Sequence, residues 1–212
     1  MSVYLAEVVR KRSPAFWSLV GLKGALVALL LLPATNPNWQ QYEDKAMQWR
    51  ILVFPLAGLV IPVLWRIAGN GHPYPHLADG LLVAAPLTDV LWNTFDAYDQ
   101  VWWWDKLVHL VNSVLIAYAI ALWLRRYALG SIVPFLLVLG MGMTFAVGWE
   151  LAEYSAGAAG YAELQTYGDT LGDLSFALLG SAAAAALAAH QPSAERGPDA
   201  GAPAPALAEG CQ

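Results

Sequence analysis

Cysteine and charge are the two features that this sequence largely lacks. Its one cysteine, Cys211, is the last residue but one, and a single thiol can form neither a disulfide framework nor a cysteine-based metal site. Charged residues make up 13% of the chain, against about a quarter in an ordinary soluble domain. The formal net charge of −5 leaves no basic patch, which argues against a nucleic acid as partner.

Several local motifs of well-known enzyme classes are also missing. The sequence has no Gly-Lys-Ser/Thr phosphate loop, no His-Glu-x-x-His zinc motif and no serine nucleophile elbow. It also lacks the Asp-Gly-x-x-Ala-Arg half of the CDP-alcohol phosphotransferase signature. A function must therefore be sought in residues that are distant in the sequence and come together in the fold.

What the sequence has in plenty is long apolar stretches. Apolar residues make up 58% of the chain, and several blocks approach the roughly 20 residues that a helix needs to cross hydrocarbon. We therefore predict an all-α fold, a polytopic membrane helical bundle of about six transmembrane helices. The expected helices cover residues 14–33, 50–68, 79–96, 103–126, 131–154 and 169–190.

The predicted domain organisation follows from these blocks. Residues 1–13 form a short cytoplasmic N-terminal segment, residues 14–190 the six-helix transmembrane domain, and residues 191–212 a disordered tail rich in alanine, proline and glycine. The first apolar block is longer than the ~7–15 residues of a signal-peptide core, so we expect it to be a retained anchor.

The basic residues predict the orientation, because cytoplasmic loops of membrane proteins carry an excess of lysine and arginine. With the N-terminus inside, seven basic residues fall at cytoplasmic ends and three at the opposite ends. The three on the opposite side are Lys45, Arg50 and Lys106. Both termini are therefore expected in the cytoplasm.

Three pairs of polar residues interrupt the apolar helices near their outer ends. Within each pair the residues are three or four apart and share one helical face. The pairs are Asp105 and His109, Glu150 and Glu153, and Asp169 and Asp173. The direction of each helix places one member a turn deeper, which gives an inner layer of His109, Glu150 and Asp173. We predict that the three pairs converge at the non-cytoplasmic edge of the bundle.

So many carboxylates cannot all stay charged in a low-dielectric site, so either some hold protons or cations bind between them. Carboxylates with one imidazole suit Mg²⁺, Mn²⁺ or Ca²⁺, and the histidine also allows Zn²⁺ or Fe²⁺. The predicted metal ligands are His109, Glu150 and Asp173. The predicted general bases, or ligands of a second ion, are Glu153, Asp105 and Asp169. Each outer residue also fits the alternative of a solvated helix end.

Four further polar residues are candidates for a supporting role. Asp89, Asn93 and Asp96 are spaced as one helical face beside the cluster. Lys23 lies in the middle of the first apolar block, too deep to reach water easily, and is expected to pair with a carboxylate such as Asp89. The alternative for Lys23 is an interior lysine held neutral.

Three of these segments carry a family resemblance. WWDKLVH at 103–109, WELAEY at 149–154 and YGDTLGDLSFALLG at 167–180 resemble the YjdF-like bacterial inner-membrane proteins. The resemblance covers roughly residues 79–185 and implies a multi-pass protein of the bacterial inner membrane with an acidic/His cluster. The order Asp-Lys-x-x-His, Glu-x-x-Glu, Asp-x-x-x-Asp is more distantly similar to VanZ-like domains, which usually show Gln where Glu153 stands and Asn near Ala177.

Functions of different classes fit these features. The first is a metal-dependent enzyme of hydrolase type, acting on a membrane lipid or a lipid-linked small molecule at the outer leaflet. The alternative is a transporter of a divalent cation or protons, in which Asp89 and Lys23 extend the acidic mouth into a path. A structural membrane subunit whose acidic rim meets a partner is the third. None of them fixes an oligomeric state.

Overall fold

The described part of the chain is all-helical. The structure, a computed structural model, describes residues 13–68, 71–127 and 129–190. Over these residues it has seven α-helices, and its only β-pairing is an isolated bridge between Lys45 and Ala162. The expected tail at 191–212 and nearly all of the expected N-terminal segment at 1–13 lie outside the described residues.

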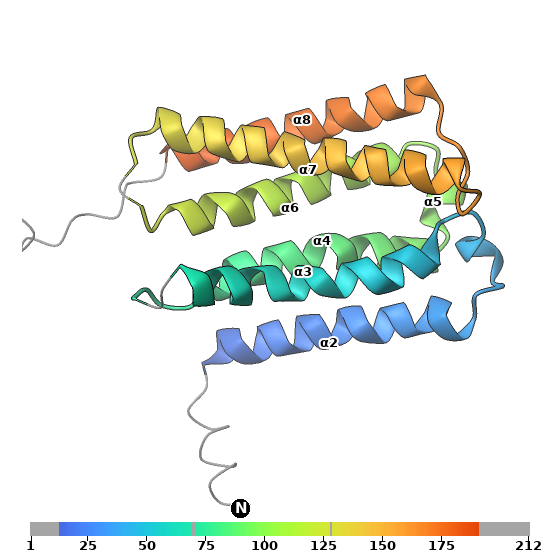
Figure 1. Ribbon diagram of the computed structural model, residues 1–212, viewed down its shortest axis with the longest axis horizontal. Coiled ribbons are helices and arrows are strands. Elements are labelled where there is room, and N and C mark those ends of the chain that lie inside the picture. The colour runs from blue at the N-terminus through green and yellow to red at the C-terminus, as the bar shows by residue number, and fades with distance from the viewer. Residues whose placement is uncertain (1–12, 69–70, 128, 191–212) are drawn as a thin grey trace, which may run out of the picture.

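Six of the helices are long and lie side by side (Figure 1). They are α2 (Pro14–Thr35), α3 (Met47–Ile67), α4 (His76–Thr94), α6 (Trp104–Leu124), α7 (Ile132–Ala158) and α8 (Tyr167–His190). A 3-10 turn, η1 (Gln40–Tyr42), and a short helix, α5 (Ala97–Gln100), lie in the connections. Each long helix overlaps a range expected from the apolar blocks, with its ends shifted by no more than four residues.

Five of these helices, α2, α3, α6, α7 and α8, are long and apolar enough to cross a membrane. Many of their large apolar side chains point outward, as helices in contact with lipid require. The remaining long helix, α4, is more polar because it carries Asp79, Asp89 and Asn93, all of them buried in the bundle. The chain is thus a helical membrane protein with five clear candidate spans.

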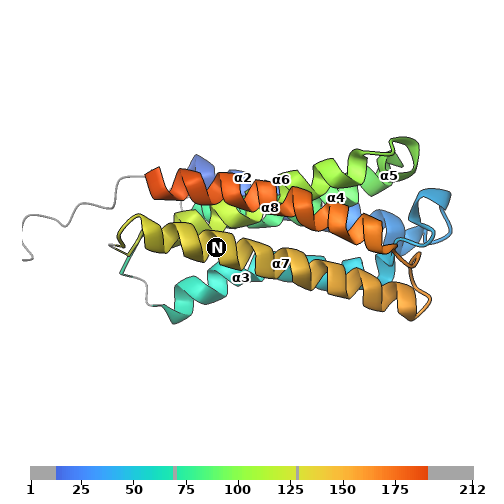
Figure 2. The ribbon, with the colours of Figure 1, turned by 90° about the horizontal axis from the view of Figure 1, so that it is seen from above.

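The bundle consists of two groups of three helices. α8 packs against α6 and α7, α4 packs against α2 and α3, and α4 also packs against α6, which joins the groups. The connections from α2 to α3, from α4 to α6 and from α7 to α8 gather at one end, on the right in Figures 1 and 2. Polar residues near those six helix ends can therefore meet, although they are far apart in the sequence.

Small residues let α6, α7 and α8 approach closely. Gly180 on α8 faces α6, where an added Cβ would collide with the carbonyl oxygen of Leu110. Gly142 on α7 faces α8, where a Cβ would lie 2.6 Å from Ser181 Oγ. Close backbone approach of this kind is the usual way in which membrane helices associate, because lipid supplies no hydrophobic drive between them.

Gly180→Ala is expected to lower the free energy of unfolding by about 1–3 kcal/mol, the usual cost of overpacking. The reason is that the new methyl group meets backbone of α6 rather than a side chain that can turn away. The measurement is denaturant unfolding in detergent micelles, followed by circular dichroism. Gly140→Ala is the matched control, since nothing lies within 4 Å of a Cβ there. Equal stability of the two variants would contradict the contact.

Candidate functional site

His109 lies at the centre of a polar cluster at this end of the bundle. It follows Asp105 by one turn of α6, and its Nε2 is 3.6 Å from Asp105 Oδ1. The same Nε2 is 3.7 Å from Asp173 Oδ1 on α8, whereas Nδ1 is 3.7 Å from Glu150 Oε1 on α7. The convergence expected from the three pairs is therefore seen in the structure, while the chemical roles of the residues stay a prediction.

The inner and outer layers of the cluster differ in burial. The inner side chains of His109, Glu150 and Asp173 are 10%, 5% and 0% exposed. The outer side chains are more accessible: Asp105 is 33%, Glu153 20% and Asp169 42% exposed. This is the order that the helix directions predict, and it places the inner carboxylates where an uncompensated charge is most costly.

Glu150 is the buried carboxylate of the cluster that has no lysine or arginine as ion-pair partner among the described residues. Both of its side-chain oxygens are buried, and neither has a hydrogen-bond partner among the described residues. The desolvation of a buried ion costs several kcal/mol even after the protein relaxes. The position next to Glu150 and His109 Nδ1 therefore favours a cation or a proton.

Lys106 supplies a cation on the other side of His109. Its Nζ lies 2.5 Å from Asp169 Oδ1, 2.8 Å from Asp173 Oδ1 and 3.4 Å from Asp105 Oδ2. Gly172 on α8 leaves room for the lysine side chain, since a Cβ there would lie 2.8 Å from Lys106 Cε. The sequence Asp-x-x-Gly-Asp of α8 thus provides both the acids and the space in which the ammonium reaches them.

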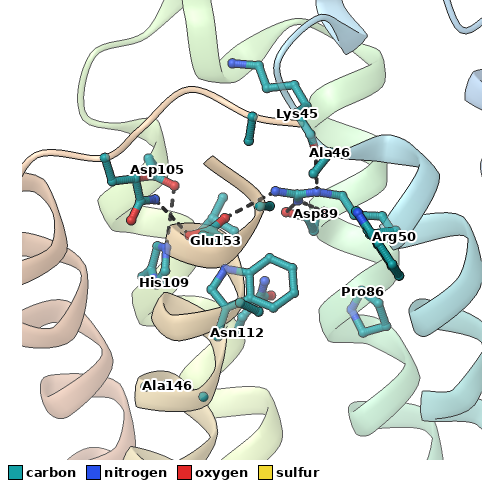
Figure 3. Close-up of a pocket in the computed structure, with 18 of the residues that line it drawn as sticks. Lys45, Ala46, Arg50, Pro86, Asp89, Asp105, His109, Asn112, Ala146 and Glu153 are labelled. Carbon is teal, nitrogen blue, oxygen red and sulfur yellow. Dashed lines mark hydrogen bonds and ion pairs between the residues drawn. The ribbon is translucent and has the colours of Figure 1, made fainter. Parts of the chain in front are cut away.

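Arg50 forms a second ion-paired centre beside the first (Figure 3). Its Nη1 lies 2.7 and 2.6 Å from the two carboxylate oxygens of Asp89 on α4, and its Nη2 lies 3.2 Å from Glu153 Oε1 on α7. Gln165 Nε2 donates to the other oxygen of Glu153 at 2.9 Å. The guanidinium also lies near the ring of Trp149, 5.1 Å from its centroid. Arg50 therefore connects α3 to α4 and to α7.

The sequence predicts Arg50 only as a charge flanking an apolar helix. In the structure α3 begins at Met47, three residues before the expected start, so Arg50 lies inside the first turn. The signal that could have found it is Asp89, a carboxylate in the interior of the neighbouring helix that needs a cation at the same depth. For Lys106 as well, the sequence predicts only a position near the outer membrane edge.

Tyr98 completes the surroundings of Asp89. Its hydroxyl donates to Asp89 Oδ1 at 3.0 Å. Burial and the nearby Asp89 carboxylate raise the pKa of Tyr98 well above its ordinary value, so the hydroxyl keeps its proton and remains a donor at neutral pH. Asp89 is thus held by both a guanidinium and a phenol.

The prediction that Lys23 pairs with Asp89 is wrong in its partner. Lys23 Nζ lies 2.7 Å from Asp79 Oδ2 and 2.8 Å from the carbonyl oxygen of Gly58. Asp79 is fully buried in the first turn of α4 and also accepts a hydrogen bond from the Tyr74 hydroxyl. Lys23 therefore does compensate an interior carboxylate, at the opposite end of α4 from Asp89.

Asp96 does not share a helical face with Asp89 and Asn93, contrary to the prediction. α4 ends at Thr94, and Asp96 adopts a left-handed backbone with φ 58°. Its side chain accepts a hydrogen bond from Gln100 Nε2 at 3.0 Å. Asn93 does remain on α4, where it is buried and donates to the carbonyl oxygen of Asp89 at 2.9 Å.

A cavity of about 1530 Å³ extends from the cluster between α3 and α4 on one side and α6 and α7 on the other. Its polar lining includes Arg50, Asp89, Asp105, His109 and Glu153, several of which Figure 3 shows. Its apolar lining includes Val53, Leu56, Val60, Ile116 and Phe145. The side chains on α3 and α7 in this second set are about half exposed on the flank of the bundle. In a membrane, this flank faces lipid.

The cluster carries an excess of negative charge. It contains six carboxylates, those of Asp89, Asp105, Glu150, Glu153, Asp169 and Asp173, and two basic side chains, Arg50 and Lys106. With His109 neutral and all carboxylates ionised, six negative and two positive groups give a formal charge of −4. A divalent cation would halve it.

Two sets of donor atoms have the spacing of a metal site. One is Asp105, His109 and Asp173, and the other is His109, Glu150 and Glu153. In each set the possible donor atoms lie within 4.8 Å of one another. Carboxylate oxygens with one imidazole nitrogen are suitable ligands for Mg²⁺, Mn²⁺ or Zn²⁺. The residues present therefore fit a divalent cation.

One comparison with known proteins gives a match. A family model described as "Predicted membrane protein (DUF2238)" matches residues 18–193. This range contains the polar cluster and the residues that line the cavity. No curated protein and no solved structure matches the chain.

Proposed function

The chain belongs to the DUF2238 family of predicted membrane proteins, and from this premise we propose that it is a metal-dependent membrane enzyme of hydrolase type. Its substrate is a membrane lipid or a lipid-linked small molecule, bound at the outer face of the bacterial inner membrane. A closer kinship with YjdF-like proteins, and a distant one with VanZ-like domains, belongs to the same proposal.

The observation that carries the proposal is the pair of unpartnered oxygens on Glu150. They are buried beside His109 Nδ1, which is 3.7 Å away. A structural carboxylate at this depth is normally paired or hydrogen-bonded. The Asp89 carboxylate illustrates this, since it lies within 2.7 Å of Arg50. Both Asp173 oxygens are also buried without a hydrogen-bond partner among the described residues, but Lys106 Nζ lies 2.8 Å from one of them, and no lysine or arginine is ion-paired with Glu150. A bound divalent cation would give Glu150 the partner that it lacks.

The shape of the cavity supports a lipid-like substrate. Its polar head is lined by most of the cluster, though not by Glu150 or Asp173. Its walls along α3 and α7 are apolar and open toward the membrane. Its volume of about 1530 Å³ exceeds the ~300–1,000 Å³ of common small-molecule pockets. An amphipathic molecule could enter from the side, with its head group at the cluster and its chain along the apolar walls.

The proposed topology has six spans, with α4 as the sixth. α4 has 19 residues, which at ~1.5 Å per residue is close to the ~30 Å of a hydrocarbon core. Its polar residues face the bundle interior, where Arg50 and Lys23 compensate the two aspartates. With six spans both termini lie on one side, and the excess of basic residues at the ends opposite the cluster supports a cytoplasmic location for them.

Among the predicted general bases, Asp105 is the best placed. It lines the cavity and lies next to His109. Glu153 also lines the cavity, but its two oxygens are held by Arg50 and Gln165. A bound divalent ion lowers the pKa of a coordinated water, and a nearby carboxylate can then accept the proton.

The test is elemental analysis of the purified protein. Wild type is expected to contain a stoichiometric divalent metal, and Glu150→Gln is expected to lose it because an amide oxygen carries no charge. Glu43→Gln is the matched control, since Glu43 is exposed and should leave the metal content unchanged. Folding of each variant is checked by gel filtration in detergent. Metal-free wild type with an intact fold would refute the proposal.

A transporter of a divalent cation or protons is the second candidate, favoured by the ion pair between Lys23 and the fully buried Asp79 at the far end of α4. Among the described residues, however, neither member of this pair lines the cavity. Uptake of Mn²⁺ into proteoliposomes that is abolished by Asp89→Asn would favour transport. Metal-dependent lipid hydrolysis without uptake would favour the enzyme.

A further inference from the structure

The two donor sets around His109 differ in how their charges are compensated. Asp105 and Asp173, which face Nε2, already share the ammonium of Lys106, at 3.4 and 2.8 Å. Glu150, which faces Nδ1, has no hydrogen-bond partner among the described residues. A divalent cation therefore gains most on the Nδ1 side, where Glu150 has no basic side chain as partner, although Arg50 Nη2 lies 3.2 Å from Glu153 Oε1.

The chemistry of the imidazole ring points the same way. A neutral imidazole offers one nitrogen as an acceptor and carries a proton on the other. A metal-bound histidine usually donates that second N–H to a carboxylate. Here Nε2 faces two carboxylates, those of Asp105 and Asp173, at 3.6 and 3.7 Å. Nδ1 is then the nitrogen available to an ion.

We propose that the site holds a single divalent cation on His109 Nδ1, Glu150 and Glu153, and that Lys106 Nζ stands in the place of a second cation among Asp105, Asp169 and Asp173. This deepens the proposed function and rests on it. It changes the predicted role of Asp173 from a metal ligand to an ion-pair partner of Lys106, 2.8 Å away. Gly172, which leaves room for the lysine side chain, is part of the arrangement.

The proposal predicts that Lys106→Met gains a metal ion. Removal of the ammonium leaves three carboxylates together, and oxygen ligands of this kind bind Mn²⁺ or Mg²⁺. Equilibrium dialysis with Mn²⁺ should therefore show one ion per chain in wild type and two in Lys106→Met. Adding Asp173→Asn to Lys106→Met should return the number to one. An unchanged single ion in Lys106→Met would overturn the proposal.

Lys45→Met is the matched control. Lys45 lies at the same end of the bundle, but its partner is the exposed Asp99, 2.6 Å away. Its loss should leave the count at one ion. A second ion in Lys45→Met would show that any loss of positive charge at this end suffices, which would contradict the specific place given to Lys106.

A measurement on wild type does not depend on how the variants fold. Electron paramagnetic resonance of Mn²⁺-loaded wild type should show an isolated Mn²⁺, because the second place is filled by the ammonium. Two metal ions ~3.5–4 Å apart, the usual spacing of a paired site, would give a spin-coupled signal and overturn the proposal. Wild type that binds no Mn²⁺ would instead refute the proposed function itself, so the two failures are distinguishable.

Discussion

Arg50→Met is expected to lower the free energy of unfolding by about 3–5 kcal/mol, the range found when one partner of a buried ion pair is removed. Arg50 lies within 2.7 Å of both oxygens of Asp89 and 3.2 Å from Glu153. Without the guanidinium both carboxylates lose their cation, although their side chains are only 10% and 20% exposed. The measurement is denaturant unfolding in detergent micelles, followed by tryptophan fluorescence.

The matched control for this variant is Arg66→Met. Arg66 is an exposed arginine on the same helix, and its loss should change stability by no more than about 0.5 kcal/mol. The double variant Arg50→Met/Asp89→Leu should recover most of the loss, because replacing both members of a buried pair by apolar groups is often neutral. If Arg50→Met is as stable as Arg66→Met, the pair is not buried in the way that the structure describes.

Arg50 also links stability to the site. It is the residue through which α3, on one side of the cavity, is ion-paired with α7 on the other. Glu153, one of the proposed metal ligands, takes its position from Arg50 and Gln165. Arg50 thus fixes the spacing between α3 and α7 and orients Glu153. A fixed spacing suits a cavity that must admit a substrate from the side.

The helices could largely be predicted from the sequence, because a bilayer imposes a length on each apolar block. The ends could not. α3 begins at Met47 because Ala46, in a left-handed conformation with φ 48°, donates from its N–H to the carbonyl oxygen of Tyr161. That contact joins the connection before α3 to the connection after α7. No local pattern reports a contact between segments more than a hundred residues apart.

The acidic and histidine members of the cluster could also be predicted, since residues three or four apart share a helical face and helix direction gives their depth. The basic side chains that pair with these carboxylates could not be predicted. The excess of basic residues in loops predicts only that Lys106 and Arg50 lie near the membrane edge, whereas in the structure both reach inward to carboxylates. Which carboxylate a long basic side chain reaches depends on helix packing, which the sequence does not give. For the same reason the predicted partner of Lys23, Asp89, is wrong, and the observed partner is Asp79.

Ala57→Trp is expected to remove lipid that copurifies with the protein. Ala57 lies on α3 in the wall of the cavity, and an indole there would occupy the space proposed for an acyl chain. Native mass spectrometry in mild detergent should show bound lipid on wild type and at least roughly tenfold weaker binding in the variant, a loss of ~1.4 kcal/mol. Val63→Trp is the matched control, because Val63 is exposed on the same helix and does not line the cavity.

The metal content of Ala57→Trp distinguishes the proposed metal site from the proposed lipid-binding cavity. The proposed ligands lie on α6 and α7, and two of them, His109 and Glu153, line the polar head of the cavity. Ala57 lies two turns of α3 beyond Arg50. The variant should therefore keep its metal while it loses its lipid, and Glu150→Gln should do the reverse. If both variants lose both, the cavity and the cluster do not act as separate sites for a chain and a head group. Lipid bound equally to wild type and Ala57→Trp would place the substrate elsewhere on the bundle.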